Sequence, residues 1–280
     1  MAALDKLSIA VAPGEVYGYL GANGAGKSTT IRLLLNFIQP TDGSATILGH
    51  DIVRDSLSIR RHVGYLSGDI ALYPKVTGRQ LLKYLGDLQS MTDTSYRDEL
   101  VKRFEATLDQ PIGELSRGNK QKIGVIQACM HLPDVLILDE PTSGLDPLMQ
   151  EHFYLTIQEA KQRGAAVLMS SHNFAEVQRT CDRIGILRHG KLVREGDLAD
   201  FNEVQKPVLQ VTFSKNVPVD LQKQKPVEIV ESKGRIAKLR SKTTIAELLG
   251  VLSKYDITDL QTQQQELEDE FLSYYQEEES

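Results

Sequence analysis

The chain has 280 residues, of which 41% are hydrophobic and 25% are charged, an ordinary balance for one large domain or for a large and a small one. Its net charge of -6 argues against nucleic acid as the main partner, because contact with phosphates needs a basic face. No apolar run of about 18 residues and no secretory signal pattern is present, so we expect no membrane-spanning segment. If the protein acts at a membrane, another subunit has to supply the membrane part.

Short apolar runs and helical patterns alternate along the first 200 residues, as is typical of a parallel sheet covered by helices. The apolar runs predict strands at residues 16–20, 45–48, 62–66, 135–138, 165–169 and 184–187, with a turn at 189–190 into 191–193. The helical patterns predict helices at residues 28–37, within 77–108 and at 120–131. Tyr17 and Tyr19 should point into the core. Cys129 and Cys181 have no ligand partners at metal spacing, so we interpret both as reduced core residues of a cytosolic protein.

The sequence changes character around residue 200, where Gln, Lys and Thr become more frequent and prolines interrupt the pattern. Alternating apolar residues at 209–213 predict a half-exposed strand, and residues 244–254 predict a helix. A second helix is predicted by an apolar stripe made of Leu267, Phe271, Leu272 and Tyr275. We therefore expect a large domain at residues 1–200 and a small α/β domain at residues 201–280.

Residues 21–28 read GANGAGKS between a predicted strand and a predicted helix, which fits the phosphate-binding pattern G-x-x-x-x-G-K-[ST]. The glycines let backbone N–H groups curl around a phosphate, and the positive end of the following helix faces the anion. Lys27 would carry the charge for the outer phosphates, and the Ser28 hydroxyl could ligate Mg²⁺. The predicted nucleotide-binding residues here are Asn23, Gly24, Ala25, Gly26, Lys27, Ser28 and Thr29.

Two adjacent carboxylates, Asp139 and Glu140, follow the buried run at residues 135–138. A phosphate-binding loop needs a second metal-site carboxylate at the end of another buried strand, and Asp139 is predicted to hold Mg²⁺ there with Ser28. Packing does not require a second acid at this position, so Glu140 is a candidate catalytic residue that orients the attacking water or accepts its proton. The pattern predicts a site for ATP and Mg²⁺.

Residues 115–121 read LSRGNKQ, and this segment resembles the signature motif of the ABC ATPases, usually Leu-Ser-Gly-Gly-Gln. Ser116 and Gly118 are kept at the start of a predicted helix, whose positive end could bind an anion. Arg117 and Asn119 depart from the motif and resemble variants of drug- and antibiotic-export branches. Further along, the SGLD segment ending at Asp146 resembles the D-loop, and His172 after Ser170-Ser171 resembles the switch histidine. The motifs follow in the family's order between about residues 4 and 195.

This resemblance implies an α/β fold, a P-loop NTPase parallel-sheet core with a small antiparallel β part and a helical subdomain at about residues 75–130. It implies a head-to-tail homodimer in which each ATP lies between Lys27 and Ser28 of one copy and Ser116 and Gly118 of the other. The D-loop with Asp146 would join the two copies, and His172 would contact the γ-phosphate and support Glu140. The last domain is similar to the extension of exporter ATPases, whose Leu-Glu-x-x-Phe ending is similar to residues 267–272.

The same resemblance implies a transmembrane permease subunit as partner, docked near residues 68–90. The cycle of ATP binding and hydrolysis would then drive transport, with export as the direction. We expect a peripheral protein at the cytoplasmic face of the cell membrane and no nucleic acid partner.

Two positions depart from the family pattern. Gly68 stands where the family has a Gln that reaches Mg²⁺, and Asp69 beside it is a hypothetical substitute acting through a water molecule. The aromatic residue on which adenine stacks in the family lies upstream of a strand that we predict at residues 4–11. We therefore expect either a native chain that starts upstream of Met1 or weaker ATP binding, by about 1–3 kcal/mol for one lost stack.

Three other functions compete with an ATP-driven motor. A nucleotide-binding regulator with weak or no turnover is favoured by Gly68 and opposed by Asp139, Glu140 and His172. A soluble ABC ATPase acting on ribosomes or DNA usually carries tandem copies or coiled-coil insertions, and the sequence has neither. A P-loop kinase leaves residues 115–121 and 143–146 without a role.

Overall fold

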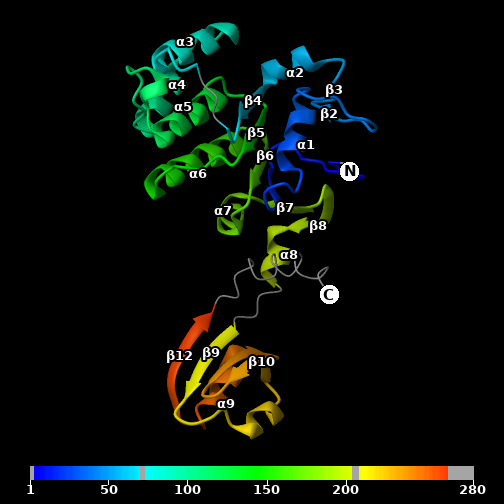
Figure 1. Ribbon diagram of the computed structural model, residues 1–280, viewed down its shortest axis with the longest axis vertical. Coiled ribbons are helices and arrows are strands. Elements are labelled where there is room, and N and C mark those ends of the chain that lie inside the picture. The colour runs from blue at the N-terminus through cyan, green and yellow to red at the C-terminus, as the bar shows by residue number, and fades with distance from the viewer. Residues whose placement is uncertain (1–2, 70–72, 204–207, 264–280) are drawn as a thin grey trace. The chain divides into compact units, whose positions relative to one another are not determined.

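The computed structural model describes residues 3–69, 73–203 and 208–263 (Figure 1). The chain forms two compact units, the first ending at Leu198 and the second beginning at Ala199. None of the helices in these ranges combines the length and the apolar character that crossing a lipid bilayer requires. Cys129 and Cys181 are both free and buried, as predicted.

A six-stranded sheet forms the centre of the first unit, in the order β4-β5-β6-β1-β7-β8. Neighbouring strands are parallel except for β7 and β8, which pair antiparallel. The predicted parallel sheet is therefore confirmed, and side chains of β1 are buried along its whole length because helices cover both faces. The strands are β1 Val16–Leu20, β4 Val63–Leu66, β5 Val135–Asp139, β6 Ala166–Ser171, β7 Arg183–Arg188 and β8 Lys191–Asp197.

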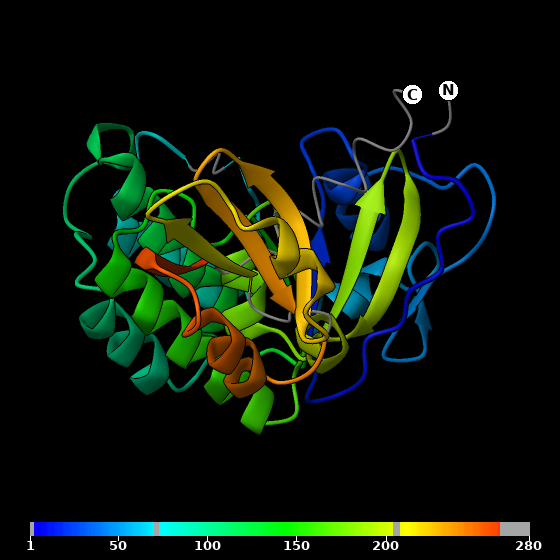
Figure 2. The ribbon, with the colours of Figure 1, turned by 90° about the horizontal axis from the view of Figure 1, so that it is seen from below.

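Helices surround this sheet, and those between residues 95 and 162 gather on one side, away from the blue N-terminal segment, in Figure 2. A separate two-stranded ribbon, β2 with β3, precedes α2. The bounds are α1 Lys27–Leu34, β2 Thr46–Ile47, β3 His50–Asp51, α2 Ser56–His62, α3 Gly78–Leu88, α4 Ser95–Arg103, α5 Arg117–Cys129, α6 Pro147–Gln162 and α7 Phe174–Thr180. Helix α8, Leu198–Glu203, begins at the boundary between the two units.

Several predicted boundaries were wrong for local reasons. The first helix ends at Leu34 instead of residue 37, because Asn36 has a left-handed backbone with φ of 53°. The helical pattern at 77–108 is two helices: a capping box at Thr77 begins α3, and Ser90, with φ of 55°, lies in the turn that follows it. Helices α2, α6, α7 and α8 were not predicted.

The strand predicted at residues 4–11 is absent. Leu7, Ile9 and Val11 do pack against the core. Within the described residues, however, no strand pairs with this segment, so its backbone cannot complete a ladder of hydrogen bonds.

Tyr17 and Tyr19 are fully buried, as predicted. The Tyr17 hydroxyl bonds to Glu195 at 2.9 Å, and the Tyr19 hydroxyl lies 3.1 Å from the hydroxyl of Thr30. Burial raises the pKa of Tyr19 to about 12, so the phenol stays neutral and keeps its hydrogen bond. Both rings thereby fix the strand that leads into the phosphate-binding loop.

The second unit has a four-stranded antiparallel sheet, in the order β10-β11-β9-β12, with one apolar core of its own. The predicted strand at 209–213 and helix at 244–254 correspond to β9 and α9, whereas the hairpin β10–β11 was not predicted. The stripe from Leu267 to Tyr275 and the ending at residues 267–272 lie outside the described residues. The elements are β9 Val208–Phe213, β10 Val227–Lys233, β11 Ile236–Ser241, α9 Ile245–Leu252 and β12 Ile257–Gln263.

Gly64 in β4 allows α5 to approach the sheet closely. A Cβ on Gly64 would collide with the carbonyl oxygen of Ala128 and lie 2.7 Å from a methyl group of Leu136. We expect Gly64→Ala to lower the free energy of unfolding by about 1–3 kcal/mol. The added Cβ meets the backbone of α5, which cannot move aside as easily as the end of a flexible side chain. Denaturant unfolding measures this, with Gly86→Ala in α3 as the control. A Cβ at Gly86 meets only Met91, at 3.6 Å, so equal losses in the two variants would contradict the explanation.

Candidate functional site

The predicted phosphate-binding loop runs from the end of β1 to the start of α1. Gly24 and Gly26 have φ of 82° and 114°, a backbone that side chains with a Cβ rarely adopt, so glycine is required there. Helix α1 has no side-chain cap and no acidic residue in its first turn, so no side chain competes for the N–H groups at its positive end. Of the remaining predicted residues, Asn23 is exposed, Ala25 is buried, and Thr29 is half-buried.

Lys27 is almost fully buried, and its ammonium group is turned inward. It donates to the carbonyl oxygen of Gly21, lies 3.4 Å from the carbonyl oxygen of Ala22, and forms an ion pair with Glu140 Oε1 at 3.4 Å. The Lys27 ammonium is thus held by one carboxylate and by neutral carbonyl oxygens. An anion with more negative charge can compete with these partners and bind the ammonium.

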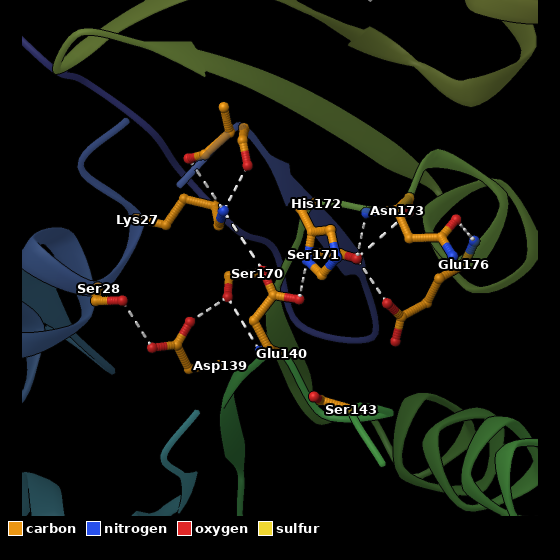
Figure 3. A network of polar contacts seen from close by, with 12 residues as sticks. Lys27, Ser28, Asp139, Glu140, Ser143, Ser170, Ser171, His172, Asn173 and Glu176 are labelled. Carbon is orange, nitrogen blue, oxygen red and sulfur yellow. Dashed lines mark hydrogen bonds and ion pairs between the residues drawn. The ribbon is translucent and has the colours of Figure 1, made fainter. Parts of the chain in front are cut away.

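Asp139 ends β5 and accepts two hydroxyl hydrogen bonds (Figure 3). Ser28 Oγ donates to Asp139 Oδ2 at 2.9 Å, and Ser170 Oγ donates to Asp139 Oδ1. A hydroxyl and a carboxylate from α1 and β5 thus converge, and such hard oxygen donors suit Mg²⁺. A Cβ on Gly68 would lie 3.4 Å from the carboxyl carbon of Asp139, so this position faces the same carboxylate.

Glu140 follows Asp139 with a left-handed backbone, at φ of 49°. That conformation costs a residue with a Cβ about 1–2 kcal/mol. Ser170 holds this conformation in place. The Glu140 N–H donates both to the carbonyl oxygen and to the hydroxyl oxygen of Ser170, at 3.2 Å in each case. The side chain then bridges Lys27 and His172, with Oε1 toward the lysine ammonium and Oε2 at 2.7 Å from Nδ1 of the imidazole (Figure 3).

His172 stands directly after β6 and is 61% exposed, so only its inner edge is held by Glu140. The structure therefore brings Lys27, Ser28, Asp139, Glu140 and His172 into one network, in which Ser170 links Asp139 to Glu140. The outer edge of the imidazole remains available to a ligand.

Glu176 is a further buried acid behind this network that the sequence analysis missed. It is 5% exposed and accepts a hydrogen bond from Ser171 Oγ at 2.6 Å. Burial raises the pKa of its carboxyl, and the hydrogen bond from Ser171 opposes the shift. The spacing from the cap Asn173 to Glu176 resembles a capping box and could have indicated a helix start, but not the contact with Ser171.

Ser116 and Gly118 lie at the start of α5, where Ser116 Oγ accepts the N–H of Asn119 at 3.2 Å. A Cβ on Gly118 would lie 2.8 Å from the carbonyl oxygen of Gly144, so the helix start rests on the predicted D-loop. Arg117 donates to the hydroxyl of Ser143 at 2.7 Å in the same place.

Asn119 and Asp146 have structural partners of their own. The Asn119 amide bonds both the N–H and the carbonyl of Thr107, each at 2.8 Å, which accounts for one departure from the family motif. Asp146 caps α6 by accepting the N–H of Met149 at 3.0 Å. Within the described residues, no hydrogen bond or ion pair joins Asn119 or Asp146 to Lys27 or Glu140.

A family model described as ABC transporter matches residues 4–143, which is half of the chain. The chain belongs to the ABC transporter family. The probable multidrug ABC transporter ATP-binding protein YbhF of Escherichia coli is 36% identical over 223 residues, covering 76% of this chain but only 38% of that protein. The uncharacterized ABC transporter ATP-binding protein YhcH of Bacillus subtilis is 32% identical over 284 residues, covering 96% of this chain and 90% of that protein.

A solved structure titled as an ATP binding subunit of an ABC transporter has the same fold. It superposes with a TM-score of 0.68 at 30% identity, over 72% of this chain and 86% of its own. The likeness confirms the predicted ABC ATPase fold, and membership in the ABC transporter family supports ATP as the bound nucleotide.

Proposed function

We propose that this ABC family member is the ATP-hydrolysing subunit of a membrane transporter. The observation that carries the proposal is Glu140, which touches both the loop cation Lys27 and the imidazole of His172. In this proposal residues 1–200 are the ATPase domain, with a helical subdomain at about 75–130, and residues 201–280 are an extension.

Bound ATP would draw Lys27 away from Glu140. The triphosphate carries more negative charge than one carboxylate, and the loop N–H groups and the positive end of α1 already favour an anion there. Ser28 and Asp139 would hold Mg²⁺, which when bound offsets charge on the phosphates. Once Lys27 turns to the phosphates, Glu140 Oε1 loses its ion pair and becomes a free acceptor.

The freed carboxylate is the proposed acceptor for a proton of the attacking water. His172 holds Oε2 at 2.7 Å and thereby fixes the direction of Oε1, while its exposed edge can reach a phosphate oxygen. Because Ser170 sets the backbone of Glu140, the acid needs no rearrangement to act.

A second copy would complete each site. Ser116 and Gly118 lie at the positive end of a 13-residue helix and make no contact with Lys27 in the described residues, so they are available to the ATP of a partner copy. ATP between two positive helix ends would favour closure of the head-to-tail dimer, with Asp146 in the junction.

A transmembrane permease is the proposed membrane partner. Near residues 68–90, Leu57 on α2 and Tyr84 and Leu88 on α3 expose apolar side chains, and Gln89 links α3 to the backbone of Arg60 on α2. Such apolar surface suits a protein partner. Similarity to a protein named for multidrug transport supports export, from a peripheral place at the cytoplasmic face of the cell membrane.

A nucleotide-binding regulator without turnover is the second candidate, favoured by Gly68 beside Asp139. Phosphate release by the full chain with ATP and Mg²⁺ separates the two functions. The motor predicts steady turnover that a chelator abolishes, whereas the regulator predicts ATP binding without release. Binding of the chain to ribosomes or DNA would instead favour a soluble ABC ATPase.

Gly68→Gln tests whether the glycine weakens the metal site. A Cβ there fits at 3.4 Å from the Asp139 carboxylate, and a glutamine amide oxygen is an acceptable Mg²⁺ ligand. We expect the Mg²⁺ concentration for half-maximal turnover to fall by about three- to tenfold, which corresponds to roughly 1 kcal/mol. Gly250→Gln, in open space on α9, is the control. An unchanged Mg²⁺ requirement in Gly68→Gln would disprove the explanation.

A further inference from the structure

The start of α5 rests on the loop that follows β5 through three separate contacts within one chain. Arg117 bonds Ser143, Gly118 lies against the backbone of Gly144, and the Gln121 side chain reaches further back toward Glu140. The helix that carries the signature residues is thus in contact with the loop that begins at the candidate catalytic acid.

Gln121 makes the deepest of these contacts. Its side chain is 3% exposed, and its amide donates to the carbonyl oxygen of Pro141 at 2.6 Å, with the carbonyl oxygen of Glu140 at 3.4 Å. Pro141 has no N–H, so its carbonyl oxygen is the backbone group by which a side chain can hold this residue. Loss of the amide would leave a buried carbonyl without a partner.

The contact matters because the Glu140 backbone is strained. A left-handed backbone at a residue with a Cβ persists only where its surroundings over-determine it. Ser170 on β6 holds the N–H side of Glu140, and the Ser143 N–H donates to its carbonyl oxygen at 3.2 Å. Gln121 on α5 holds the next residue, Pro141, and lies 3.4 Å from the same Glu140 carbonyl oxygen. The side chain of Glu140 can point at Lys27 and His172 because both sides of its backbone are held.

We propose that Gln121 is a positioning residue for Glu140, and that it connects the signature helix of a chain to the catalytic acid of the same chain. The inference rests on the proposed function, because it assumes that Glu140 acts on the attacking water. Gln121 touches no nucleotide-binding residue of the loop at residues 21–28 in the described structure. Its removal therefore acts on the chemical step and leaves ATP binding in place.

Helix α5 provides a matched control. Gln127 is a second glutamine on it, and its amide donates to the carbonyl oxygen of Tyr65 at 2.5 Å, on β4 and away from Glu140. Gln121→Met and Gln127→Met each remove one amide donor to a backbone carbonyl from the same helix. Loss of helix packing should affect both variants alike, whereas loss of Glu140 positioning should affect only the first.

The experiment measures kcat and KM for ATP, together with thermal melting, on the full chain. We expect kcat of Gln121→Met to fall about tenfold, the rate equivalent of 1.4 kcal/mol, with KM within about twofold. Gln127→Met should keep its kcat at a similar melting temperature. Added to Glu140→Gln, the Gln121→Met change should cause no further loss. If Gln121→Met does not fold, Gln121→Asn, too short to reach Pro141, provides the same test.

Equal kcat losses in the two glutamine variants, or a further tenfold loss on top of Glu140→Gln, would overturn the inference. Failure of the proposed function gives a different result, because the unchanged chain would then release no phosphate, or Glu140→Gln alone would turn over ATP as fast as the unchanged chain does.

Discussion

Replacing Glu140 by glutamine is expected to reduce ATP turnover by about 10²- to 10⁴-fold, the usual contribution of a general base. The amide has nearly the same shape and can still meet His172, which lies 2.7 Å from the carboxylate, but it cannot accept a proton. ATP binding should persist, because Lys27 is then free to face the phosphates. Phosphate release and equilibrium binding of ATP measure the two effects separately.

Glu105→Gln is a matched control for this change. Glu105 also has a left-handed backbone, at φ of 48°, but it is exposed at the end of α4 and away from the site. We expect it to leave turnover unchanged. If Glu140→Gln retained more than about a tenth of the normal rate, its role as the base would be wrong.

The second large effect is expected on binding, from Lys27→Ala. A charge-assisted hydrogen bond contributes about 1.5–3 kcal/mol, so the loss of the ammonium should weaken ATP binding by about 10- to 100-fold. The same change also leaves Glu140 Oε1 without its cation, so the free protein should be no more stable than the original. Equilibrium binding of ATP at fixed Mg²⁺ measures the loss.

Lys191→Ala is the control for the lysine change. Lys191 is 63% exposed and pairs with Asp5 at 3.2 Å, so it contributes surface charge of the same sign outside the loop. Its variant should bind ATP within about twofold of the original, since exposed ion pairs contribute little. Equal weakening in both lysine variants would mean that long-range charge, rather than contact with phosphate, explains the affinity.

Much of the fold follows from short-range patterns. Continuous apolar runs identified β1, β5 and β6, because strands buried on both faces leave no polar positions. The turn from β1 into α1 was recognisable from its glycines, two of which have the positive φ that the pattern requires.

The errors lie where distant contacts decide the structure. Residues 4–11 have the apolar composition of a strand, but within the part of the chain that the structure describes no strand pairs with them. Two residues of β2 pair with β3 because Leu48, with φ of 53°, and Gly49 turn the chain there. Local composition does not reveal such pairing.

The candidate site was predictable in its members but not in its contacts. Spacing placed Asp139 and Glu140 at a strand end near Lys27, yet only the three-dimensional arrangement shows that Lys27 pairs with Glu140. The roles of Asn119 and Gln121 depend on partners 12 and 20 residues away, and no local pattern predicts them.

The central claim is that ATP joins the loop of one copy to the signature helix of another. The most direct measurement is the mass in solution of Glu140→Gln, with saturating ATP and with ADP. A slow variant that still binds ATP should accumulate as a dimer with ATP and remain a single chain with ADP, and adding Lys27→Ala should abolish the dimer. A single-chain mass with ATP fully bound would contradict the claim.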